Sequence, residues 1–93
     1  MPIGIWGQRH LRFIKQERKG LHMGLLSAGR LNSYLADINA QAEERVILLT
    51  EQMAAREGVT EKLKSEDQME WVGRMNSIRN RAEEIIYSEL IYS

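Results

Sequence analysis

The sequence contains no cysteine, and this absence excludes a disulfide framework and any thiolate metal site. The two histidines, His10 and His22, match neither the HxxxH nor the HExxH spacing, so we expect no metal centre. No serine lies in a GxSxG turn, and the phosphate-binding patterns GxxxxGK[ST] and GxGxxG are also missing. We therefore expect a protein that is not an enzyme and holds no cofactor.

Long apolar runs are missing as well. The longest is Val46 to Leu49, far short of the roughly 20 apolar residues that span a bilayer. The first residues lack the charged start and apolar centre of a signal peptide. Together with the lack of cysteine, these features predict a cytoplasmic protein with no membrane partner.

Proline occurs only at Pro2, so no helix further along the chain is broken by it. A length of 93 residues with 43% hydrophobic residues predicts one domain, residues 1–93. Apolar residues recur at steps of three and four over 31–57 and again over 65–90, which predicts two long helices. Gly58 matches a C-cap glycine, and Ser65 with Gln68 matches a capping box.

A connection of only a few residues requires the two long helices to lie antiparallel. The sequence therefore predicts an all-α fold, an antiparallel helical hairpin with two shorter N-terminal helices, about 7–28, packed against it. The residues expected in the core lie on the two apolar stripes: Leu35, Ile38, Leu49, Trp71, Met75, Ile78 and Ile85.

Charge is distributed unevenly although the net charge is zero. Residues 1–30 hold six basic residues and one acidic residue, and residues 31–93 hold seven basic and twelve acidic residues. On a helix over about 7–19, His10 falls on the apolar half, where we expect a buried core histidine. The opposite half carries the candidate nucleic-acid-binding residues Arg9, Arg12, Lys15 and Lys19.

Two interpretations of this basic arc stay open. One is a face that contacts phosphates, and the other is a solvated helix surface. No aromatic residue interleaves the arc, so it does not predict a stacking platform for single strands.

Short motifs run in order along almost the whole chain. The most specific, residues 67–79, reads DQM-x-WVG-x-MN-x-IR. The others are Ile3-Gly4 with Gly7, Leu25-Leu26, Gly29-Arg30-Leu31, Gly58-Val59-Thr60 and Ala82-Glu83-Glu84-Ile85. With these motifs the sequence resembles the TnpV family, short proteins encoded on bacterial transposons. Family members tend to carry a further segment ahead of Ile3, and a basic residue and a tyrosine where this chain has Ile5 and Trp6.

The resemblance and the basic arc together imply a non-enzymatic accessory protein of a mobile element, which contacts DNA or a transposon-encoded recombinase. The alternative is a helical module for protein–protein interaction, as a homodimer or with another partner, without a role on nucleic acid. Its motivation is a set of apolar residues beside the main stripes: Tyr34, Ile47, Leu48 and Tyr87.

Overall fold

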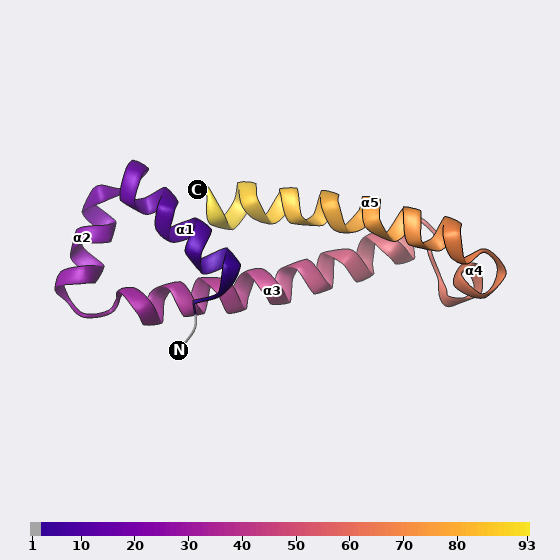
Figure 1. Ribbon diagram of the computed structural model, residues 1–93, viewed down its shortest axis with the longest axis horizontal. Coiled ribbons are helices and arrows are strands. Elements are labelled where there is room, and N and C mark those ends of the chain that lie inside the picture. The colour runs from indigo at the N-terminus through magenta and orange to yellow at the C-terminus, as the bar shows by residue number, and fades with distance from the viewer. Residues whose placement is uncertain (1–2) are drawn as a thin grey trace.

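The computed structural model describes residues 3–93 as an elongated helical molecule of 55 × 24 × 18 Å (Figure 1). Residues 1 and 2 of the predicted domain 1–93 lie outside the described residues. The helices are α1 (Gly4–Glu17), α2 (Lys19–Ser27), α3 (Leu31–Arg56), α4 (Glu61–Glu66) and α5 (Gln68–Ile86), followed by a π-helical turn, η1 (Tyr87–Ile91). Residues 3–93 contain no strand, and the predicted all-α class is confirmed.

The two longest helices lie alongside each other and run in opposite directions (Figure 1). At one end the chain that connects them forms α4, and at the other end α1 and α2 lie beside the start of α3 (Figure 1). The chain's last residues return to α1, so η1 packs against both α1 and α3. This return brings the His10 ring into contact with the backbone carbonyl of Ile91, 81 residues further along the sequence.

Gly58 ends α3 as its sequence position predicts. Its φ is +71°, which a residue with a Cβ rarely adopts. The N–H of Val59 donates to the Ala54 carbonyl at 2.9 Å, and that of Gly58 donates to the Ala55 carbonyl at 3.3 Å. These two bonds form a Schellman motif, with Val59 packed against Ala54.

The predicted helix over 65–90 is divided in the structure. Asp67 interrupts it with φ −149° and ψ 88°, and its carboxylate accepts from the N–H of Glu70 at 3.1 Å. The Ser65 hydroxyl instead donates to the Lys62 carbonyl, so the predicted Ser65–Gln68 capping box is wrong. Aspartate is as good an N-cap as serine, and only the backbone geometry decides between two such neighbours.

The helix predicted over 7–19 also has different bounds. It begins earlier, at Gly4, and ends at Glu17, because Arg18 leaves the helical region at φ −134° and ψ 57°. Lys19 is therefore the first residue of α2 and does not belong to the same helix as the other candidate residues.

The core forms two clusters along α3. One joins Trp6 to Ile38, Ala42, Ile86 and Ile91, and the other joins Ala54, Val59 and Ile78. Of the expected core residues, the structure buries Leu35, Ile38 and Ile78, and it leaves Leu49, Trp71, Met75 and Ile85 partly exposed.

Ile86, rather than the expected Ile85, is fully buried in the core. The buried positions of α5 step by four from Ile78 through Ala82 to Ile86, so the stripe turns slightly past Ile85. Trp71 packs at the edge of its cluster, with the Lys64 ammonium 4.7 Å from the ring centroid.

Candidate nucleic-acid interface

Helix α1 is held against α3 by its glycines and by one asparagine. The Asn39 side-chain oxygen accepts from the backbone N–H groups of Trp6 and Gly7, at 3.1 and 3.3 Å. It thereby satisfies two of the donors that the first turn of a helix leaves unpaired. A Cβ at Gly7 would lie 2.8 Å from the Leu35 carbonyl oxygen, so this glycine sets how closely the two backbones approach.

His10 fixes α1 to the rest of the molecule from its buried side. The side chain is almost fully buried, as predicted, with 3% exposure. Its Nδ1 lies 2.7 Å from the Ile91 carbonyl oxygen and its Nε2 lies 2.8 Å from the Tyr34 hydroxyl. Because a carbonyl only accepts, Nδ1 donates, and in the neutral ring Nε2 accepts from Tyr34.

The Tyr34 hydroxyl is thus bonded within the molecule. Burial raises the pKa of its hydroxyl, and the nearby Arg18 charge partly opposes that rise. The hydroxyl therefore remains protonated and able to donate to His10 around neutral pH.

With this side of α1 buried, the opposite side faces solvent. Arg12 and Lys15 are exposed there, one turn apart. Arg9 lies at the edge of this surface, partly buried, with its guanidinium 4.9 Å from the centroid of the Tyr87 ring. We call Arg9, Arg12 and Lys15 the basic face of α1. Lys19, the fourth candidate, is exposed but begins α2.

The basic face makes no ion pair with the rest of residues 3–93. The salt bridges in this part of the chain join Arg45 to Glu89, Lys62 to Glu66, Arg74 to Glu70 and Arg81 to Glu57. The last pair, a two-bond contact, lowers the pKa of the Glu57 carboxyl chiefly through the Arg81 hydrogen bonds. All four of these ion pairs thus lie within residues 31–93, and the cations of α1 remain open to a partner.

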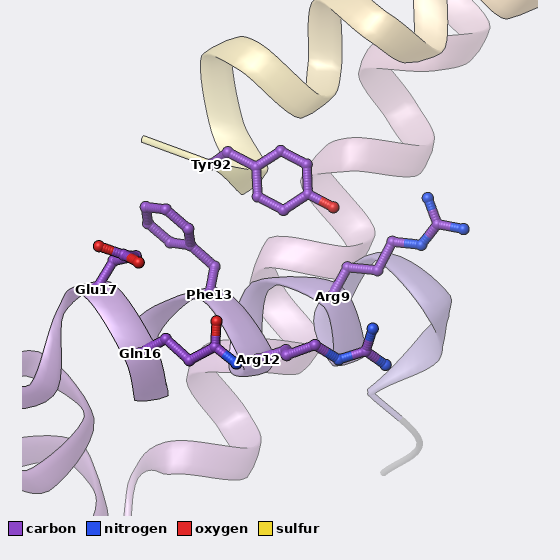
Figure 2. A pocket seen from close by; sticks show the side chains of 6 residues that line it. All are labelled: Arg9, Arg12, Phe13, Gln16, Glu17 and Tyr92. Carbon is purple, nitrogen blue, oxygen red and sulfur yellow. The ribbon is translucent and has the colours of Figure 1, made fainter.

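Beside the basic face lies an open groove of about 400 Å³ (Figure 2). Arg9, Arg12, Phe13, Gln16 and Glu17 line it from α1, and Tyr92 lines it from the end of the chain. In Figure 2 the two arginines extend toward one end and Glu17 lies at the other, with both aromatic rings between them, and the Gln16 side chain extends toward that of Arg12.

Tyr92 is the residue that sequence reasoning missed. No aromatic residue interleaves the basic arc in the sequence, yet the ring of Tyr92 lies 5.8 Å from that of Phe13, centroid to centroid, beside Arg9 and Arg12. No pattern in the sequence indicates that these two rings are close, because Phe13 and Tyr92 meet only through the packing of η1 on α1.

The apolar residues considered for the alternative function fall into two groups. Tyr87 packs inside the molecule, with its ring 4.8 Å from that of Trp6, and Tyr34 bonds to His10. Ile47 and Leu48 remain exposed on α3, at 60% and 49%. Of these four residues, Ile47 and Leu48 are the two that the structure leaves exposed.

Residues 3–93 form neither a metal-binding cluster nor a helix that could cross a membrane. No group of three or more metal-ligating side chains comes together in this part of the chain. None of its helices has both the length and the apolar character that crossing a bilayer needs.

The sequence was also compared with known proteins. The family model described as "Transposon-encoded protein TnpV" matches residues 1–91, essentially the whole chain. Neither the curated proteins nor the solved structures provided a match.

Proposed function

Because the chain belongs to the family of transposon-encoded TnpV proteins, we propose that it is a non-enzymatic accessory protein of a bacterial transposon that contacts DNA through the basic face of α1. The same face could instead contact a DNA-bound, transposon-encoded recombinase. The observation that supports it is the exposure of Arg12 and Lys15, one turn apart and outside every ion pair of residues 3–93.

Phosphate contacts of this kind suit an accessory role. They supply affinity and orientation by charge alone, and they carry no sequence information. Choice of site along the DNA would then come from the recombinase or from another protein of the element.

Duplex DNA should bind with an affinity that falls steeply as salt rises. Each phosphate contact contributes roughly 0.9 to the slope of log affinity against log salt. Replacing both residues (Arg12→Gln with Lys15→Gln) should therefore lower the slope by about 1.8 and leave the melting temperature unchanged, since both side chains are exposed. Fluorescence anisotropy at four or more salt concentrations measures this.

The matched control removes two cations elsewhere. Lys62→Gln with Arg79→Gln changes the net charge equally, on exposed positions of α4 and α5. This control variant should keep the slope of log affinity against log salt that the unaltered protein shows. If both double variants behave alike, net charge and not the basic face governs binding, and if the unaltered protein shows no salt-dependent binding, the proposal is wrong.

The second candidate function is a protein-interaction module, supported by the exposed neighbours Ile47 and Leu48. It predicts that sedimentation equilibrium at micromolar concentration gives about twice the chain mass of 10.8 kDa. Ile47→Glu with Leu48→Glu should then restore the single-chain mass, because charges would enter the interface. A uniform 10.8 kDa species for the unaltered protein would count against self-association.

A further inference from the structure

The groove beside the basic face combines two features that the sequence places far apart. One is a pair of arginines, and the other is an exposed tyrosine supported by further rings. Tyr92 is 48% exposed, although its ring stacks on that of Tyr87 at 5.5 Å with 18° between the planes. Phe13 contacts it from α1, at 60° between the planes. Tyr92 is therefore held in place while much of its surface stays open.

We propose that this groove binds an unpaired nucleotide of a single DNA strand, whose base packs against Tyr92 and Phe13 while its phosphate meets Arg9 and Arg12. This inference rests on the proposed function, since it uses the same basic face, and it names the form of DNA that the face takes. Cations that follow the backbone, beside aromatic rings that accept any base, are the common elements of single-strand binding sites.

The two ends of the groove differ in chemistry, and this difference orients the nucleotide. Arg9 and Arg12 extend toward one end, where they can neutralise a phosphate (Figure 2). The Glu17 carboxylate at the other end would repel a phosphate but can accept hydrogen bonds from the amino group of a base. The Gln16 amide, which extends toward the Arg12 side chain in Figure 2, both donates and accepts, so it suits either a phosphate oxygen or a base edge.

Arg9 also links the two halves of the site. Its guanidinium lies over the Tyr87 ring, the same ring on which Tyr92 stacks. This contact restrains the long arginine side chain before DNA arrives, which reduces the entropy that binding would cost. The groove volume of about 400 Å³ lies within the range of small-ligand sites and suits one nucleotide.

The test compares three labelled DNA molecules by fluorescence anisotropy. Two are single strands, oligo(dT) of ten nucleotides and a decamer of the same backbone without bases, and the third is a ten-base-pair duplex. The two single strands carry the same phosphates, so only base contacts separate them. We expect oligo(dT) to bind about tenfold more tightly than the abasic strand, which is the usual effect of one stacked base. Equal affinity for these two strands would overturn the inference.

Three variants assign the effect to the groove. Tyr92→Ala should abolish the preference for oligo(dT) over the abasic strand, and Tyr92→Phe, which keeps the ring, should retain it. Arg12→Gln should lower the affinity for oligo(dT) and for the abasic strand by a similar factor, because it removes a phosphate contact only. Melting temperatures are measured beside the affinities, and a preference that survives Tyr92→Ala in a folded protein contradicts the proposal.

The same measurements separate failure of this inference from failure of the proposed function. If all three DNA molecules bind equally and with a steep salt dependence, the basic face contacts phosphates but the groove binds no base. If none binds with salt dependence, both proposals are wrong. Free thymidine monophosphate, added as competitor at the same nucleotide concentration, should displace oligo(dT) poorly, and equal competition would point to a free-nucleotide site instead of a strand.

Discussion

Replacing His10 by alanine should lower the free energy of unfolding by about 3–5 kcal/mol, through two lost hydrogen bonds and the cavity left in the core. The ring is almost fully buried and joins three elements, because it lies on α1, bonds to Tyr34 of α3 and bonds to Ile91 of η1. Its removal leaves the Ile91 carbonyl and the Tyr34 hydroxyl without their partner. Urea denaturation monitored by circular dichroism measures the change.

Two further variants serve as comparisons for this change in the free energy of unfolding. Tyr34→Phe removes one of the two hydrogen bonds and keeps the ring's packing, so it should cost about 1–2 kcal/mol. Gln8→Ala lies on the exposed side of the same helix and should change stability by less than about 0.5 kcal/mol. A loss below about 1 kcal/mol for His10→Ala would mean that this network does not hold α1 in place.

Gly7→Ala should destabilise the protein by about 2 kcal/mol, although alanine is the better helix former. The added methyl would lie 2.8 Å from the Leu35 carbonyl oxygen, an atom of the α3 backbone that cannot rotate away. Helix α1 must then move off α3, and its bonds to the Asn39 oxygen lengthen. Thermal unfolding and urea denaturation both report the effect.

Gly73 offers the matched control for this substitution. It lies within α5 and a Cβ there would meet nothing within 4 Å. Gly73→Ala should therefore stabilise the protein by about 0.5–1 kcal/mol through helix propensity alone. If the two substitutions change stability in the same direction, the close approach of α1 to α3 is not what requires glycine at position 7.

The glycines that carry part of the family resemblance thus have a physical role in this fold. Gly4 has a φ of +68° and lies against the Asn39 side chain, and Gly7 lies against the α3 backbone. Both positions set the distance and angle at which α1 meets α3. They therefore also set where the basic face of α1 and its groove lie.

Hydrophobic periodicity was sufficient to determine the all-α class and, within one residue, the bounds of α3. The cap at Gly58, the burial of His10 and the exposure of Arg12 and Lys15 also follow from local pattern. Each depends on residues within a few turns of one another, where spacing alone decides which side of a helix a residue occupies.

Only the tertiary structure decided the features that depend on distant residues. Local propensity does not distinguish a break at Asp67 from one at Ser65, or an end at Glu17 from one at Lys19, because competing caps and packing differ by small free energies. The groove needs the return of the chain from α5 to α1, which places Tyr92 beside Phe13. No periodicity within either segment encodes that contact, so the aromatic half of the candidate site could be found only in the folded molecule.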